Sequence, residues 1–231
     1  MGSAVDLACK TLQQKLKEIA IKSAPVFSGM NAEGLEVKNE MVISKTDANV
    51  KMDIVNLLKL ANQDKIDLTI SSNGKTAAQL KFTSNSFSAH FVKLGVNPKD
   101  GTVKILQVVT TGDAGKIISP KTARSQMLGG VVGGVGMVLS EKLEIDHKTG
   151  QIINASFGGY HVPLHSHIPP TDVWFVNKPD PNINDIGAKG IGEIALIGLA
   201  AAITNAVYNA TGKRVRDLPI TPEKLGFKTK A

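Results

Sequence analysis

The residue with the clearest chemical potential is a glutamate that follows a glycine-rich loop. Glu193 comes directly after Gly187-Ala188-Lys189-Gly190-Ile191-Gly192, and an apolar segment follows it. Glycines let backbone approach a ligand closely, and a carboxylate between such a loop and an apolar helix would be withdrawn from water, which suits a general base. The alternative is structural, since an acid in the first turn of a helix complements the helix dipole. The residues alone favour this alternative.

A run of glycines inside a predicted helix is the second unusual feature. Ser119 and Pro120 predict the start of this helix, with serine at the cap and proline in the first turn. Interior glycine costs about 1 kcal/mol relative to alanine, so something must require small side chains at Gly129, Gly130, Gly133, Gly134 and Gly136. Their spacing favours close packing against another backbone, and contact with a flat buried cofactor is the alternative.

The histidines and the cysteine give weaker indications of a functional site. His161, His165 and His167 lie among prolines in a predicted surface loop, and no carboxylate or cysteine sits beside them at ligand spacing. We therefore do not assign these histidines to a metal site. Cys9 is the only cysteine, which excludes an intrachain disulfide and an iron–sulfur cluster ligated by this chain alone. Any such redox centre must come from another chain.

The composition is that of a globular protein with a basic surface. The formal net charge of the 231 residues is +7, which fits nucleic acid, a phosphate-bearing cofactor or an acidic partner. Scattered lysines and a 4% aromatic content argue against nucleic acid. The apolar run over residues 128–139 is too short for a membrane span, which needs about 20 residues. Because no secretory signal is visible, we expect no membrane association and a cytoplasmic location.

Hairpins and long helices are the predicted elements, and they do not alternate as βαβ units, so we expect an α+β fold in which hairpins pack with long buried helices. We predict two parts, an N-terminal helix with a small α+β subdomain over residues 1–85 and a C-terminal α+β subdomain over residues 86–231. The first should contain a helix over 4–20, a hairpin over 35–43, a helix over 50–60, and strands over 65–70 and 78–82 around a Ser72-Asn73-Gly74 turn.

The C-terminal part is predicted to hold the residues with chemical potential. Its most secure element is a hairpin over residues 88–109 that turns at Pro98-Lys99-Asp100-Gly101. The remaining predictions are the glycine-bearing helix over 119–141, two short strands around a turn at 146–150, a strand over 172–176, and a helix over 193–210. The last helix is apolar nearly all the way round, which predicts deep burial in a larger body.

The chain resembles the molybdenum hydroxylases, the xanthine dehydrogenase and aldehyde oxidase family. Residues 187–193 match the family's Gly-x-x-Gly-x-Gly-Glu signature. The segment Ala123-Arg124-Ser125-Gln126-Met127-Leu128-Gly129-Gly130 and the closing segment over residues 211–222 are also similar to the family's. The likeness extends over residues 86–225 and implies the molybdenum-cofactor-binding fold, in its C-terminal part.

The resemblance implies a role for each site residue. Glu193 would be the catalytic base in the water-derived hydroxylation of an N-heterocycle or an aldehyde. Gln126 would hydrogen-bond the pterin, and Gly192 and Gly190 would bring backbone close to the cofactor. Gly2 and Ser3 would begin the helix that follows a pterin-binding loop. Molybdenum itself would be held by the dithiolene of the pterin, without a protein ligand.

The same resemblance implies partners. The molybdenum–pterin cofactor, as molybdopterin or its cytosine dinucleotide, would be shared with an upstream segment or subunit, and a [2Fe–2S] cluster and FAD would lie on partner subunits. The chain alone should be inactive, and the surfaces that the upstream part covers, including the glycine face of the helix over 119–141, should be exposed or self-associated. The alternatives are a non-catalytic scaffold of the same fold and a basic domain that binds an anionic ligand.

Overall fold

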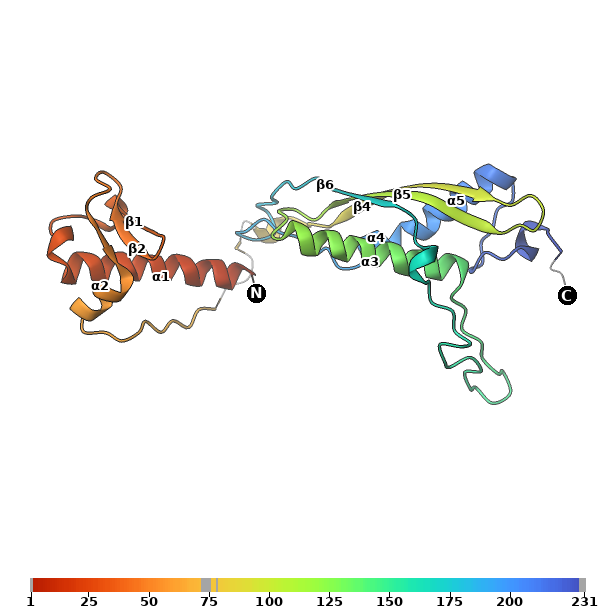
Figure 1. The fold of residues 1–231 in the computed structure, drawn as a ribbon, viewed down its shortest axis with the longest axis horizontal. Coiled ribbons are helices and arrows are strands. Elements are labelled where there is room, and N and C mark those ends of the chain that lie inside the picture. The colour runs from red at the N-terminus through yellow and green to blue at the C-terminus, as the bar shows by residue number, and fades with distance from the viewer. Residues whose placement is uncertain (1, 72–75, 78, 229–231) are drawn as a thin grey trace. The chain divides into compact units, whose positions relative to one another are not determined.

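The computed structural model describes residues 2–71, 76–77 and 79–228, so the turn predicted at Ser72-Asn73-Gly74 lies outside the described residues. The chain forms two compact units (Figure 1). Unit 1 comprises Met1–Ala77 and Asn184–Ile186, and unit 2 comprises Ala78–Ile183 and Gly187–Ala231.

Unit 1 packs one long helix on a small antiparallel sheet. The elements are α1 (Gly2–Ser23), β1 (Leu35–Lys38), β2 (Met41–Ser44), β3 (Lys51–Asp53) and α2 (Ile54–Leu60), with short 3-10 turns at Pro25–Phe27 and Ala32–Gly34. The sheet order is β1-β2-β3, so the hairpin predicted over 35–43 is confirmed. Its apolar core is formed by Leu16, Ala20, Ala24, Phe27, Leu35, Val42 and Leu57.

Two predictions for this region are wrong in detail. The helix expected over residues 50–60 begins only at Ile54, because Lys51–Asp53 pairs with β2 and the Asp53 carboxylate accepts the Asn56 N–H as the helix cap. The strands expected over 65–70 and 78–82 do not form in the described residues, where only a 3-10 turn, Gln79–Lys81, is present. Leu80 is 70% exposed and Phe82 is 51% exposed, so the large apolar side chains of this segment do not pack in a core as those of a half-buried strand would.

Unit 2 covers one face of a mixed sheet with helices (Figure 1). The strands β4 (Phe87–Val96) and β5 (Val103–Asp113) form the predicted hairpin, and β6 (Thr171–Phe175) runs parallel to β5. The helices are α3 (Pro120–Leu139), α4 (Ile194–Ile197) and α5 (Leu199–Thr211), with a 3-10 turn at Glu223–Leu225. The core between the sheet and these helices includes Val108, Val131, Val135, Val138, Leu199, Ile203 and Val207. Helices and hairpins together confirm the α+β class.

Packing explains the glycines of α3. A Cβ on Gly130 would lie 2.7 Å from the Ala195 Cβ, and one on Gly134 would lie 2.7 Å from the Leu199 Cδ2. The interpretation of close packing is therefore confirmed at these positions. The expectation that the whole glycine face is exposed is wrong, because α4 and α5 cover Gly130 and Gly134. Gly129 differs, since nothing lies within 4 Å of a Cβ placed there.

The last predicted helix is interrupted. Instead of one helix from Glu193, the structure has α4 and α5 separated by Gly198. Within this chain the stretch is not buried on all sides, because Ile197 is 76% exposed, and burial in a larger body stays a prediction. By length and composition the stretch Ile194–Thr211 could cross a membrane, but Leu199, Ile203 and Val207 on its inner face are fully buried in the core of unit 2.

A long loop over residues 140–164, here called the arm, leaves the end of α3 and runs away from the helices of its unit (Figure 1). The two strands predicted around the turn at 146–150 reduce to a single bridge between Ile145 and Ile152. At its base the Tyr160 hydroxyl donates to the Glu141 carboxylate over 2.8 Å. The arm also holds an apolar pocket lined by Leu143, Ile152, Asn154, Ala155, Ser156, Phe157 and Tyr160.

Candidate functional site

The glycine-rich loop before Glu193 is fixed by backbone hydrogen bonds to the segment that follows β5. The Lys116 N–H donates to the Gly187 carbonyl over 2.8 Å, and the Lys189 N–H donates to the Ala114 carbonyl over 2.8 Å. Gly187 has a φ of +69°, in the left-handed region that favours glycine. A Cβ on Gly115 would collide with the Gly187 carbonyl. The close backbone contact therefore explains both glycines without a ligand.

An ion pair strengthens this contact. The Lys189 ammonium lies 3.0 Å from the Asp113 carboxylate and is 7% exposed, and it faces the ring of Phe87 at 5.8 Å. The pKa of Asp113 is lowered, first by the hydrogen bond from the Gly115 N–H and then by Lys189. Lys189 is thus a structural cation that links the glycine-rich loop to the end of β5.

Gln126 and the signature meet directly. The Gln126 amide on α3 donates to the Gly192 carbonyl over 2.8 Å, and Glu193 follows as the N-cap residue of α4. The structure therefore brings Gln126, Gly192 and Glu193 together. Gly190 lies in the same loop, and its carbonyl accepts the hydroxyl of Ser86.

The Glu193 side chain is exposed and makes no capping hydrogen bond. The expectation that Glu193 is withdrawn from water is therefore wrong for this chain. Among the described residues its carboxylate has no hydrogen-bond or ion-pair partner. The structural alternative, an acid that complements the helix dipole, stays open, because Glu193 is the N-cap residue of α4 although its side chain makes no capping hydrogen bond. The Glu193 carboxylate is thus free of partners within the described part of the chain and follows a loop that backbone hydrogen bonds hold in place.

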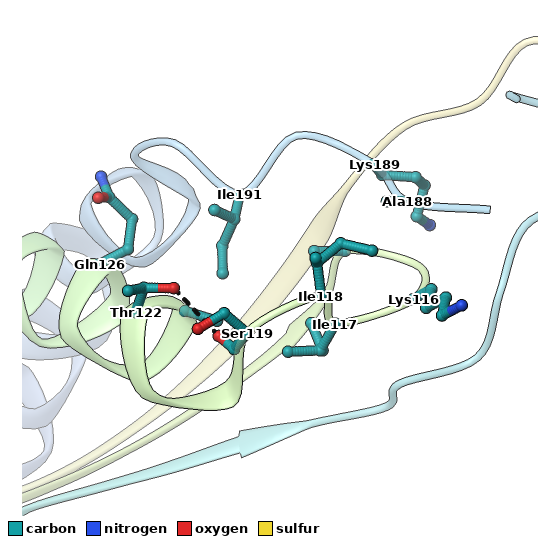
Figure 2. Close-up of a pocket in the computed structure, with 11 residues that line it drawn as sticks. Lys116, Ile117, Ile118, Ser119, Thr122, Gln126, Ala188, Lys189 and Ile191 are labelled. Carbon is teal, nitrogen blue, oxygen red and sulfur yellow. Dashed lines mark hydrogen bonds between the residues drawn. The ribbon is translucent and has the colours of Figure 1, made fainter. Parts of the chain in front are cut away.

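A pocket of about 380 Å³ opens between the loop after β5, the first turns of α3 and the glycine-rich loop (Figure 2). Figure 2 shows Gln126 at the end of the pocket nearest Ile191, and Lys116 toward the other end. The lining residues are Ala114, Lys116, Ile117, Ile118, Ser119, Thr122, Ala123, Gln126, Ala188, Lys189 and Ile191. Ser119 occupies the N-cap of α3 as predicted, but its side chain makes no capping bond.

The pocket suits an anionic ligand with a flat apolar part. The positive end of a 20-residue helix, α3, faces it together with the exposed lysine Lys116, and such helix ends bind phosphate through free N–H groups. Ile117, Ile118 and Ile191 supply apolar walls, and Gln126 supplies an amide. This donor set fits a pterin that carries a phosphate. Within the described residues no group of three or more His, Cys, Asp or Glu could hold a metal ion.

Gly2 and Ser3 lie in unit 1, where they begin α1. A Cβ on Gly2 would lie 2.7 Å from the Ile186 Cδ1, so Gly2 packs tightly within its own unit. Ile186 is the residue before Gly187 in the chain. The assignment of Gly2 and Ser3 to the cofactor site stays a prediction, and so do the roles assigned to Gln126, Gly190, Gly192 and Glu193.

Sequence reasoning missed three polar residues beneath the signature. Ser88 and His90 point from β4 toward α4, and Thr110 lies beside them on β5. A signal was present, because Ser88 and His90 alternate along the predicted strand and must share one face. What the sequence could not show is that this face is covered by a helix whose Ile194 lies 106 positions after Ser88.

Comparison with known proteins identifies the family. The molybdopterin cofactor-binding domain family matches residues 1–169. The aldehyde oxidoreductase molybdenum-binding subunit PaoC of Escherichia coli (strain K12) is 45% identical over 145 residues, 63% of this chain. The xanthine dehydrogenase molybdenum-binding subunit of Escherichia coli O157:H7 is 35% identical over 150 residues, 64% of this chain. The chain therefore belongs to the molybdenum hydroxylase family and carries part of its molybdopterin-binding region.

A solved structure supports the fold over nearly the whole chain. The reconstituted CO dehydrogenase from Oligotropha carboxidovorans superposes with a TM-score of 0.74 over 97% of this chain at 19% identity. This chain covers 28% of that protein and 20% of each of the two curated relatives. It thus spans about a fifth of the length of the curated relatives that it matches.

Proposed function

We propose that this chain is part of the molybdopterin-binding subunit of a hydroxylase or dehydrogenase, and that Glu193 is its catalytic base. The observation that supports the proposal is the hydrogen bond from Gln126, which lines the pocket, to the carbonyl of Gly192, the residue before Glu193. When bound, the molybdenum cofactor would supply the two-electron oxidation and the activated water.

The chain's own residues bind, orient and exclude water. The N-terminus of α3 and Lys116 bind the phosphate of the cofactor, and the isoleucine walls keep water away from its apolar part. Gln126 fixes the Gly192 carbonyl, so the backbone that leads into Glu193 has one conformation. The Glu193 carboxylate takes up the proton released when water oxygen is transferred to the substrate. Because no partner in the described residues occupies this carboxylate, it is available as a base.

The substrate class follows from the relatives whose names include an aldehyde oxidoreductase and a xanthine dehydrogenase. We propose an aldehyde or an N-heterocycle, oxidised at an electron-poor carbon. Electrons would leave through a [2Fe–2S] unit and an FAD unit on partner subunits, since the single Cys9 cannot ligate a cluster. The complete assembly would work in the cytoplasm, and this chain alone would be inactive.

The test is a substitution in the assembled enzyme. The chain is co-expressed with the rest of its molybdenum subunit and the partner subunits, and turnover and molybdenum content are measured for wild type, Glu193→Gln and the control Glu36→Gln. Glutamine keeps the size of the side chain but cannot accept the proton, so kcat should fall by about 100-fold or more with molybdenum content unchanged. Glu36 is an exposed acid on β1 of unit 1, and its variant should retain full turnover.

Unchanged turnover of the fully loaded Glu193→Gln enzyme would remove the base assignment. The scaffold interpretation, in which Glu193 is vestigial, would then be the better account. Loss of molybdenum from the variant would assign Glu193 to cofactor retention instead of proton transfer.

A further inference from the structure

The two carbonyl groups on either side of Glu193 are each held by a side chain from a different element. On the N-terminal side the Gln126 amide of α3 donates to the Gly192 carbonyl over 2.8 Å. On the C-terminal side the Ser88 hydroxyl of β4 donates to the Ile194 carbonyl over 2.6 Å. The carbonyl groups of the two residues next to Glu193 in the chain thus each accept a hydrogen bond from a side chain of another element.

Ser88 is the last member of a chain of hydrogen bonds. The His90 Nε2 lies 3.0 Å from the Ser88 Oγ, and the Thr110 Oγ1 lies 2.9 Å from the His90 Nδ1. Thr110 is fully buried. Burial also lowers the pKa of His90, so the neutral imidazole is the form expected near neutral pH.

The direction of these hydrogen bonds follows from the number of protons that each side chain carries. Ser88 has one hydroxyl proton and donates it to the Ile194 carbonyl, so its oxygen must accept from His90 Nε2. The neutral ring therefore carries its proton on Nε2, and Nδ1 is left to accept the hydroxyl proton of Thr110. Each donor has one acceptor, from Thr110 through His90 and Ser88 to Ile194.

The same histidine also shapes the helix. A Cβ on Gly198 would lie 2.5 Å from the His90 Cδ2, so the imidazole occupies the space that a side chain would need. The Gly198 N–H points to the Leu196 carbonyl, and the helix breaks here into α4 and α5. The polar face of β4 thus contacts α4 at both ends, through Ser88 at Ile194 and His90 at Gly198.

We propose that Thr110, His90 and Ser88 form a positioning relay that fixes the backbone of Glu193 by holding the Ile194 carbonyl. The relay rests on the proposed function, because positioning matters to turnover only if Glu193 is the base. None of its three residues touches the reacting atoms. Their role is to keep α4, and with it the carboxylate, in one place.

The matched pair Thr110→Val and Thr110→Ser tests the relay at its most distant member. Valine has the shape of threonine and favours strands, but it removes the donor to His90 Nδ1. The ring should then populate both tautomers, and whenever Nδ1 carries the proton, Nε2 competes with Ile194 for the Ser88 proton. Serine keeps the hydroxyl and should restore the single tautomer.

The first readout is 15N NMR of the imidazole in the full chain. Of the five histidines, His90 is assigned by its loss in His90→Gln. Wild type and Thr110→Ser should show the proton on Nε2, and Thr110→Val should show a mixture. A ring in wild type that is protonated on Nδ1, or one that Thr110→Val leaves unchanged, would overturn the relay. This readout needs neither cofactor nor substrate.

The second readout is turnover of the assembled enzyme with full molybdenum content. Loss of one hydrogen bond that positions the base should lower kcat by about three- to tenfold in Ser88→Ala and somewhat less in Thr110→Val, with KM nearly unchanged. Thr110→Ser should restore kcat. Equal kcat in all these variants, while Glu193→Gln is inactive, would overturn the relay and leave the base assignment standing.

Failure of the proposed function can be distinguished from failure of the relay. If the tautomer responds to Thr110→Val as expected but Glu193→Gln keeps full turnover, the proposed function fails, and the relay survives only as a description of the hydrogen bonds under α4. That result would also overturn the positioning role.

Discussion

At the scale of single residues, Asp113 and Lys189 show how the glycine-rich loop depends on protonation. The pKa of the Asp113 carboxyl is lowered from its ordinary 3.8 by the Gly115 N–H and by Lys189. A lowered folded-state pKa means that the carboxylate stabilises the folded chain above the unfolded-state pKa, and that this contribution is lost as pH falls through the lower, folded-state value.

Asp113→Asn should therefore lower the free energy of unfolding by a constant amount between about pH 5 and pH 8, and the deficit should shrink below about pH 3.8. Urea unfolding of both proteins at several pH values measures this difference. The neighbouring exposed acid Asp172, whose amide variant Asp172→Asn should show a much smaller deficit, is the control. A difference in the free energy of unfolding that grows as the pH falls would contradict the stabilising role of the Asp113 carboxylate.

The resemblance to the molybdenum hydroxylases singled out Glu193 and Gln126, but their surroundings were harder to predict. The contact of Gln126 with Gly192 joins residues that are 66 positions apart in the chain, and nothing local signals it. The expected withdrawal of Glu193 from water was wrong because α4 begins at the surface of unit 2. The relay was missed because a histidine on an alternating strand is interpretable only when the covering helix is known.

At the scale of elements, the glycines of α3 have opposite roles although they are neighbours. A Cβ on Gly130 would lie 3.0 Å from the Leu196 backbone nitrogen and 2.7 Å from the Ala195 Cβ, whereas Gly129 faces open space. Gly129→Ala should raise the free energy of unfolding by up to about 1 kcal/mol through helix propensity. Gly130→Ala should lower it by about 1–3 kcal/mol, because α4 must shift.

Urea denaturation of the two variants checks this pair, with equal dependence on urea concentration showing that only stability has changed. If Gly130→Ala also stabilised the chain, α4 would not pack on α3 as described. The hydrogen bond between Gln126 and Gly192 would then lose its structural basis, and the site would need another explanation.

The elements that local pattern predicts well are those whose partners are close in sequence. The hairpin of β4 and β5 is confirmed because its alternation and its turn lie together, and α3 is confirmed because its cap position and proline are local signals. The pairing of β6 with β5 is parallel and follows the arm, so no local signal predicts it. The break at Gly198 was missed because its cause, His90, lies on another element.

At the scale of the whole molecule, the arm exposes several large apolar side chains. Phe157 is 87% exposed, Ile153 66% and Leu143 52%, and they accompany an apolar pocket of about 350 Å³. Exposed patches of this kind mark contact surfaces. Because the chain spans about a fifth of its curated relatives, the rest of the molybdenum subunit is the expected partner.

The chain alone should therefore associate reversibly through the arm, and Phe157→Ser should weaken this association by removing the largest exposed ring. Sedimentation velocity over a range of concentrations measures it, and binding of a fluorescent apolar dye should fall in parallel. Val55→Ser, at a 64% exposed position on α2 of unit 1, is the control and should leave both signals unchanged. A strictly monomeric wild-type chain that binds no dye would contradict the prediction, since it would mean that the arm needs no cover.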